Sequence, residues 1–230
     1  MKIRVKFSKT GPIKFIGHLD VMRYFQKAIR RADIDIQYTE GFSPHQIMSF
    51  AAPLGLGDTS ECEYMDIEVG QVTSSDDMKA RLNAVMTEGI EVLSCRALPE
   101  KCKNAMASTA AADYRLRFRA GYEPDEAFWD ELTAFVERPE IVITKKTKKS
   151  EKEMDIRPFI LAFRVEADSM FFKVTAGSAD NLKPELVIEA FCAATGRELS
   201  SFALETHRVE LYARNDNGDL ISLEDLGETF

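Results

Sequence analysis

The chain has 230 residues, of which 45% are hydrophobic and 30% charged, with a formal net charge of −8. This length allows one large domain or two compact ones, and the composition excludes a wholly disordered chain, collagen and a coiled coil. No apolar run approaches the ~20 residues of a membrane span, and the first residues lack the apolar region of a secretion signal. We therefore expect a cytoplasmic protein, in agreement with its four cysteines and their lack of a disulfide pattern.

The negative charge is unevenly distributed along the chain. Residues 1–50 carry nine Lys or Arg and four Asp or Glu, whereas residues 51–100 carry three and ten. A second basic segment opens the second half of the chain. This repetition suggests an internal duplication, and it confines any nucleic-acid surface to part of an acidic chain.

The first half predicts the order strand, helix, strand, strand, helix, strand. Met1 to Phe7 alternate apolar and basic side chains, as a half-buried strand does. From Leu19 to Ala32 the apolar period becomes helical, and Ser74 or Ser75 is expected to cap a second helix that ends near Thr87. The other expected elements are an extended segment 34–38, a Gly- and Pro-marked loop 40–53, and strands 63–69 and 90–98.

The second half repeats this order. Its expected elements are strand 113–119, helix 126–137, a β-rich run 141–144, strands 159–166 and 170–175, helix 184–194 and strand 201–213. The sequence thus predicts an α+β fold of two tandem ferredoxin-like (βαββαβ) units with mainly antiparallel sheets, divided into residues 1–104 and 105–230.

Basic side chains line one face of the first strand of each unit. The two rows are Lys2, Arg4 and Lys6 in the first unit and Arg115, Arg117 and Arg119 in the second. In a βαββαβ unit the helices cover one face of the sheet, so we expect both rows on the open face. Open faces of this kind bind single-stranded RNA when they combine positive charge with aromatic side chains.

The alternative explanation for these rows is cross-strand charge pairing. In the first unit, Asp66 and Glu68 fall on the adjacent antiparallel strand, which favours pairing. In the second unit, the adjacent strand points Phe171, Lys173 and Thr175 outward, which leaves the arginines less neutralised. We therefore predict a surface for nucleic acid or another anion from Arg115, Arg117, Arg119 and Lys173.

Two further charged segments each have a structural and a functional explanation. The first helix carries a basic stripe of Arg23, Lys27, Arg30 and Arg31. The stripe is expected to be a solvated helix face, with docking of an acidic partner as the alternative. The run from Lys145 to Glu153 is expected to be the mobile tip of a hairpin, with contact to a phosphate backbone as the alternative.

Two of the three histidines flank the first helix. They lie in Gly17-His18-Leu19-Asp20 and in Glu40-Gly41-Phe42-Ser43-Pro44-His45. With Asp20, and with Asp66, the two histidines are residue types suited to general acid–base catalysis or a metal site, although the spacing matches no metal signature. The structural alternative is that His18 caps the helix and Asp20 complements its dipole.

Several motifs are absent from the sequence. It contains no Walker loop and no GxGxxG, GxSxG or CxxC pattern. It also lacks a CxxxCxxC run, so the chain cannot by itself hold the three-cysteine iron–sulfur cluster of a radical SAM enzyme.

The segment from Phe15 to Gly57, continued by residues 61–69, resembles the bacterial radical-SAM-linked domain family of uncharacterised function. The motifs that carry the resemblance are Gly17-His18-Leu19-Asp20, Glu40-Gly41-Phe42-Ser43-Pro44-His45-Gln46, Pro53-Leu54-Gly55, Ser60-Glu61-Cys62-Glu63-Tyr64-Met65-Asp66 and the later Lys152-Glu153-Met154-Asp155-Ile156-Arg157-Pro158. Gly17, Ser43 and Gln46 depart from the family pattern, which has Ser, Asn and Pro there.

The resemblance implies association with a B12-binding radical SAM protein, in RNA modification or processing. The iron–sulfur cluster, SAM and cobalamin are then expected in that partner, with no cofactor or metal in this chain. The resemblance also adds weight to one functional cluster. Its members are His18, Asp20 and His45 as candidate catalytic residues and Arg23, Glu40 and Asp66 as candidate substrate-binding residues.

Three functions remain open from the sequence. The leading hypothesis is a cytoplasmic accessory protein that presents a substrate, tRNA or rRNA above all, to the radical SAM partner. The second is a stand-alone, metal-independent RNA-processing or RNA-modifying enzyme in which His18 or His45 is the general base. This second hypothesis rests on analogy with the tandem ferredoxin-like units of CRISPR-repeat endoribonucleases and pseudouridine synthases. The third is a protein–protein adaptor.

Overall fold

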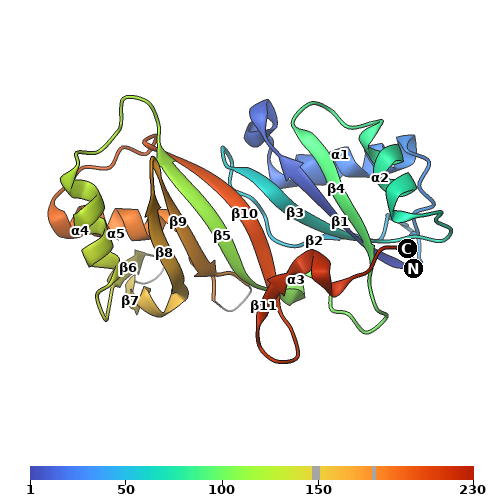
Figure 1. Cartoon of the computed structure of the whole chain (residues 1–230). Helices are drawn as coiled ribbons and strands as arrows, with labels where there is room; N and C mark the ends of the chain where they lie inside the picture. Colours follow the sequence, from blue (N-terminus) through green and yellow to red (C-terminus); the bar gives the residue numbers. More distant parts are fainter. Residues whose placement is uncertain (147–150, 178–179) are drawn as a thin grey trace. The chain divides into compact units, whose positions relative to one another are not determined.

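The computed structural model describes residues 1–146, 151–177 and 180–230 of the chain (Figure 1). Over these residues the fold is mixed α/β, with five α-helices and mainly antiparallel strands. The helices are α1 (His18–Arg31), α2 (Ser75–Asn83), α3 (Ala105–Ser108), α4 (Ala127–Val136) and α5 (Glu185–Thr195), and the 3-10 helices are η1 (Gly11–Phe15), η2 (Arg157–Phe159) and η3 (Leu223–Leu226). The strands are β1 (Lys2–Lys9), β2 (Met48–Phe50), β3 (Thr59–Glu68), β4 (Ile90–Ala97), β5 (Thr109–Phe118), β6 (Val142–Lys146), β7 (Glu151–Asp155), β8 (Ile160–Glu166), β9 (Ser169–Thr175), β10 (Leu204–Arg214) and β11 (Leu220–Ser222).

The chain forms two compact units, and the first is discontinuous in sequence. Unit 1 comprises residues 1–110 and 208–230, and unit 2 comprises residues 111–207. The division expected from the sequence, 1–104 and 105–230, groups the last residues with the second unit instead. Local periodicity identifies the last strand as a strand but does not reveal which other strands it joins.

The sheet of unit 1 is built around β1 and β3. In it, β1 pairs antiparallel with both β3 and β4, and β2 pairs antiparallel with β3, so that these strands follow the order β4-β1-β3-β2. Part of β10 also lies beside β3, where the Cys62 thiol donates to the Arg208 carbonyl at 3.7 Å. Strand β11 extends this arrangement by pairing with β10.

Alternation along β1 divides the two faces of this sheet. Ile3, Val5 and Phe7 are completely buried and join one hydrophobic core with α1 and α2. Phe25 and Ile29, one helical turn apart on α1, are completely buried in that core. On α2, Ser74 caps the helix by accepting a hydrogen bond from the Asp77 backbone at 3.1 Å, which confirms the expected cap.

The opposite face of β1 corrects one expectation. We expected Lys2, Arg4 and Lys6 on an open face. Lys2 is exposed, but Arg4 is completely buried and the Lys6 side chain is only 13% exposed. Residues after β10 cover this face: Arg4 donates to the Leu223 carbonyl at 2.9 Å, and Lys6 donates to Glu224 at 2.7 Å. The C-terminal segment, red in Figure 1, thus covers the face that the helices leave open.

Unit 2 has the strand order β10-β5-β9-β8. Leu116 and Phe172 are completely buried and pack in one core with Leu132 of α4 and Phe191 of α5. Because these residues point to the helix side, Arg115 and Phe171, which are paired across β5 and β9, point to the other face.

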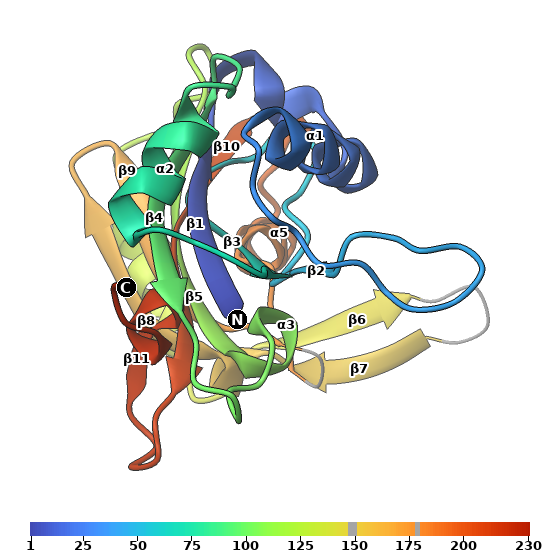
Figure 2. The same ribbon diagram turned by 90° about the vertical axis from the view of Figure 1, so that its right-hand side faces the viewer.

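A hairpin of β6 and β7 stands between α4 and β8 in the chain, as expected for the basic run (Figure 2). Residues 147–150, at the centre of that run, lie outside the described residues. Among the described residues, no helix has the length and apolar character needed to cross a membrane.

Candidate functional site

The first helix positions three of the predicted site residues. His18 begins α1, and its ring packs edge-on against Phe50 of β2, with the ring centroids 5.3 Å apart. Asp20 lies in the first turn, where a carboxylate is favourable to the helix dipole, and it accepts a hydrogen bond from Arg23 at 3.2 Å. Both members of this pair are about two-thirds exposed. Gly17, rather than a side chain of His18, occupies the N-cap position.

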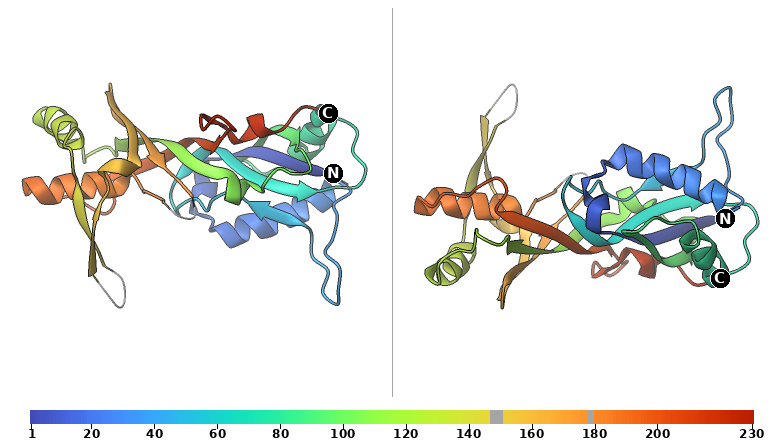
Figure 3. Two further views of the ribbon diagram at one scale, coloured as in Figure 1. Left: turned by 90° about the horizontal axis from the view of Figure 1, so that it is seen from below. Right: turned by 90° about the horizontal axis from the view of Figure 1, so that it is seen from above.

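His45 belongs to a closed loop between α1 and β2. The Thr39 backbone donates to the His45 carbonyl at 2.9 Å, and the Thr39 hydroxyl lies 3.1 Å from both the His45 backbone nitrogen and the ring Nδ1. Glu40 and Phe42 are exposed at the tip of this loop, which projects away from the strands of unit 1 (Figure 3). His45 therefore closes the loop through its hydrogen bonds to Thr39.

The contacts divide the predicted cluster among three places. The Gln46 amide donates to the Gln26 carbonyl at 3.2 Å, which fixes the His45 loop beside the second half of α1. His18 lies eight residues earlier, about 12 Å along the helix axis. Asp66 points away from α1, because Met65 and Ile67 on either side of it enter the core that contains α1. In the described part of the chain, no group of three or more His, Cys, Asp or Glu is placed to hold a metal ion.

Asp66 has a buried cation as its partner. Arg4 donates from Nε to Asp66 Oδ1 at 2.8 Å and from Nη2 to Oδ2 at 2.9 Å. The Ala105 backbone, at the start of α3, also donates to Asp66 Oδ2 at 2.7 Å. The carboxylate thus joins β1, β3 and α3, and the expected pairing of Arg4 with Asp66 is confirmed by their register.

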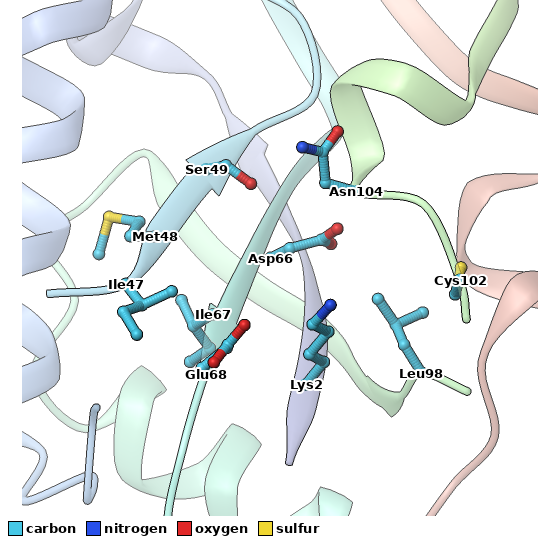
Figure 4. Close-up of a pocket in the computed structure, with 10 residues that line it drawn as sticks. All are labelled: Lys2, Ile47, Met48, Ser49, Asp66, Ile67, Glu68, Leu98, Cys102 and Asn104. Carbon is cyan, nitrogen blue, oxygen red and sulfur yellow. The ribbon is translucent and has the colours of Figure 1, made fainter. Parts of the chain in front are cut away.

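A hollow of about 280 Å³ opens beside this carboxylate (Figure 4). Its lining comes from β2, β3, Lys2 and the segment from Leu98 to Asn104. Figure 4 shows Lys2 and Ser49 directing their polar groups toward the Asp66 side of the hollow, with Leu98 on the wall. No histidine is among the described residues that line it. The hollow offers an apolar wall with a few polar groups, an arrangement suited to binding.

The cysteines of the chain lie in different surroundings. Cys62, Cys95 and Cys192 are buried, and Cys102 is partly exposed at the rim of the hollow. Burial raises the pKa of the Cys95 thiol to about 12 and also raises the pKa of Cys62 and Cys192. A raised pKa keeps these three thiols protonated and poorly nucleophilic at neutral pH.

The second basic row remains at the surface of unit 2. The side chains of Arg115, Arg117 and Arg119 are 43%, 60% and 37% exposed. Each has an acidic partner: Arg115 donates to Glu166 at 2.8 Å, and Arg117 and Arg119 approach Glu205 at 2.9 and 4.0 Å. Hydrogen bonds from Arg115 above all, and also from Arg164, lower the pKa of Glu166.

An aromatic ring lies within this row. Phe171 stands opposite Arg115 on one side and Arg164 of β8 on the other. The Arg164 guanidinium covers the Phe171 ring at 3.5 Å from its centroid, and the arginine side chain itself is 56% exposed. Lys173, two residues further along β9, lies 3.6 Å from Asp113.

Arg117 and Arg119 also line a hollow of about 760 Å³ in unit 2. Trp129 and Phe118 supply aromatic surface there, and Glu205 supplies a carboxylate. Four of the predicted residues are therefore placed on or beside one sheet face of unit 2: Arg115, Arg117, Arg119 and Lys173.

Comparison with known proteins identifies the family. A family model described as "Uncharacterized protein conserved in bacteria (DUF2344)" matches residues 2–184. The chain belongs to this family. Comparison with curated proteins gave no match. Among solved structures, "Crystal Structure of a Cbf5-Nop10-Gar1 Complex" matches with a TM-score of 0.43 and 11% identity, covering 91% of this chain and 48% of that chain. The chain thus spans about half the length of the chain that it matches.

Sequence reasoning missed a second buried ion pair in this DUF2344 chain. Arg208 is 2% exposed, and its Nη2 lies 2.5 Å from Glu63 Oε1 and 3.1 Å from the Ala52 carbonyl. The sequence contained one signal for this pair. Glu63 lies two residues before Met65 on the same strand and therefore on the same inward side as Met65 and Ile67, and a charge that points inward requires a buried partner.

Proposed function

We propose that this DUF2344 protein binds single-stranded RNA on the exposed sheet face of unit 2. One observation carries the proposal: exposed arginines form a row on a sheet face that no helix among the described residues of unit 2 covers, and beside this row the exposed Arg164 guanidinium lies flat over the buried ring of Phe171. Sheet surfaces bind unpaired nucleotides through phosphate contacts to cations and through stacking of bases on aromatic rings or guanidinium planes. The stacked guanidinium of Arg164 offers such a plane.

The contrast between the two units supports this choice of surface. Both first strands carry three basic residues, but in unit 1 the residues around η3 cover Arg4 and Lys6, and Arg4 is completely buried. In unit 2 the corresponding arginines keep 37–60% of their side-chain surface. A phosphate can therefore reach all three arginines of the second row, whereas in the first row Arg4 is buried and Lys2 is the exposed member.

The acidic partners of these arginines are compatible with RNA binding. Glu166 and Glu205 hold the arginines in exposed pairs, which contribute little to stability. A phosphate can replace such a carboxylate at low cost, and the pairs keep the side chains extended over the sheet until it does. Affinity is then expected to fall with salt, as phosphate contacts do.

The partner and the finer fold are part of the same proposal. By resemblance, we propose that the RNA is tRNA or rRNA, that it is presented in the cytoplasm to a B12-binding radical SAM protein, and that this partner holds the iron–sulfur cluster, SAM and cobalamin. We also interpret each unit as ferredoxin-like. The strand orders β4-β1-β3-β2 and β10-β5-β9-β8 support this interpretation, because both are the split-βαβ order.

The test compares two charge-reversal variants with the same change in net charge. Arg115→Glu/Arg117→Glu/Arg119→Glu should abolish the salt-dependent gel shift of a tRNA or rRNA fragment. Arg23→Glu/Lys27→Glu/Arg30→Glu, on α1, should leave it intact. An unchanged shift in the first variant, or equal loss in both, would contradict the proposed surface. Circular dichroism of both variants confirms that they are folded.

A further inference from the structure

Unit 1 exposes apolar side chains at the start of α1. Phe15, Leu19 and Leu56 are 63%, 60% and 70% exposed. The loop that contains Leu56 is tied to this place, because the Gly57 backbone donates to the Lys14 carbonyl at 2.9 Å. We call these three side chains the apolar patch. Large exposed apolar groups gathered in one place are typical of interaction sites.

A basic stripe continues from this patch along α1. Leu19, Arg23 and Lys27 follow one another at four-residue spacing, and Arg30 lies seven residues after Arg23, so all four share one helix face. Arg23, Lys27 and Arg30 are exposed, whereas Phe25 and Ile29 on the opposite face are completely buried. The outer face of α1 is thus apolar at its start and positively charged over its remaining length.

The loop 39–45 is held beside the second half of α1. Its tip presents Phe42, whose side chain is as exposed as in an extended chain, at 109%. The loop is held closed by the hydrogen bonds between Thr39 and His45, and the Gln46 amide ties it to the Gln26 carbonyl of α1. Holding the loop in place reduces the entropy lost when Phe42 is buried against a partner.

We propose that the outer face of α1, from the apolar patch to Phe42, docks an acidic amphipathic segment of a partner protein. Charge complementarity with the basic stripe selects an acidic segment, and the apolar patch and Phe42 require apolar side chains on the same segment. The helix length, about 21 Å for 14 residues, suits a partner helix of similar length. Two of the three side chains of the apolar patch, Leu19 and Leu56, are aliphatic, and aliphatic side chains favour a protein over RNA because bases do not stack on them.

This inference deepens the proposed function by giving the partner protein a surface distinct from the RNA surface. Aromatic and aliphatic side chains anchor such interfaces, and Phe42 and the apolar patch supply them here. The two surfaces lie in different units, so they can be tested separately.

The experiment is photo-cross-linking of the full chain in a bacterium that encodes it. The photoreactive amino acid p-benzoylphenylalanine replaces Phe42 in one variant and Leu19 in a second. A third variant carries it in place of Asp216, an exposed residue of unit 1 in the turn before β11, as the control. Lysates are treated with nuclease, and the cross-linked peptides are identified by mass spectrometry.

The expected result is that positions 42 and 19 cross-link to one protein, within one segment that has net negative charge and apolar residues at helical spacing. Adding Arg23→Glu/Lys27→Glu/Arg30→Glu should reduce both cross-links to the level of the Asp216 control. Cross-links to RNA, to a segment without acidic residues, or at control level would overturn the inference, as would cross-links that survive the charge reversal.

The Arg115→Glu/Arg117→Glu/Arg119→Glu variant separates the two proposals. It should lose the RNA shift and keep both cross-links. If the cross-links fail while the RNA shift remains, the docking surface is wrong and the RNA surface stands.

Discussion

Arg4 and Asp66 face each other on adjacent antiparallel strands and are joined by two parallel hydrogen bonds of 2.8 and 2.9 Å. Arg4 has no exposed surface, and its remaining guanidinium nitrogen donates to the Leu223 carbonyl. By contrast, Asp20 and Arg23 form a single hydrogen bond of 3.2 Å at the surface. Both pairs join an arginine to an aspartate, but because only the Arg4–Asp66 pair is buried, breaking it should cost far more stability than breaking the Asp20–Arg23 pair.

Replacing Asp66 should therefore destabilise unit 1 strongly. Asp66→Asn keeps the shape but leaves the Arg4 charge buried without a counter-charge, a situation that costs about 3–5 kcal/mol. Urea unfolding measures the change in free energy. The matched control, Asp20→Asn, breaks an exposed pair and should cost less than about 1 kcal/mol. Similar costs in the two variants would show that burial of the Arg4–Asp66 pair is not what matters.

Stability should fall in acid through Glu224. Burial alone would raise the pKa of Glu224, but hydrogen bonds from Lys6 and Ser94 outweigh it and lower the pKa below its ordinary value of 4.5. A lowered pKa in the folded state gives stability that is present above pH 4.5 and is lost as the pH falls through the folded value. Glu224→Gln should therefore be less stable than the wild type at pH 7 and should lose less stability in acid.

Urea unfolding at a series of pH values from neutral to acid checks this prediction. Lys6, the cation that pairs with Glu224, makes stability depend on pH at the alkaline end as well. Burial alone would lower the pKa of Lys6, but its hydrogen bonds to Glu210 and Glu224 raise that pKa above the ordinary 10.5. The stability that Lys6 contributes is fully present below pH 10.5 and is lost as the pH rises through the raised pKa of the folded state. Identical pH profiles for Glu224→Gln and the wild type would contradict the assignment.

One thiol in four should react quickly in the folded protein. Cys102 is partly exposed, whereas the other three thiols are buried and have raised pKa values. Labelling with a thiol reagent at neutral pH should modify one cysteine per chain rapidly and four after unfolding. Mass spectrometry should place the label on Cys102, and Cys102→Ser should remove the rapid phase. Rapid labelling of Cys62 or Cys95 would mean that unit 1 opens locally.

Stacking and charge on the unit 2 face can be separated at Arg164. Arg164→Lys keeps the positive charge but loses the planar group that covers Phe171. If bases stack on this guanidinium, Arg164→Lys and Arg164→Ala should both weaken RNA binding, by about tenfold, since stacking contributes ~1–3 kcal/mol per base. If the residue acts only by charge, Arg164→Lys should bind as the wild type does. Fluorescence anisotropy with an unpaired RNA oligonucleotide at fixed salt distinguishes the two.

Local patterns in the sequence predicted most of the elements. The alternation in residues 1–7 and 113–119, the helical period after Leu19 and the capping serine at residue 74 are each local signals, and each corresponds to an observed element. Strand pairing in unit 1 was also accessible, because antiparallel register places Asp66 opposite Arg4 once both strands are recognised. Short elements such as β2 and α3 were missed because three or four residues are too few to show a period.

Long-range contacts account for the rest. Nothing near Leu223 in the sequence indicates that its carbonyl accepts from Arg4, 219 residues away, so the closed face of unit 1 could not be predicted. The candidate site also depends on long-range contacts that local sequence patterns do not reveal. Residue types drew attention to His18 and His45, but tertiary contacts place one against Phe50 and the other against Thr39. The exposed ring of Phe42 lay within a recognised motif, yet its exposure is known only from the fold.

The discontinuity of unit 1 has a consequence for how the protein is made. Residues 208–230, which cover the buried charges of β1, leave the ribosome about 200 residues after β1 itself. Domains usually fold in the order in which they are synthesised. Here unit 2 is complete in the nascent chain before unit 1 can be, and Arg4 of the first strand stays uncovered until residues 208–230 have been synthesised.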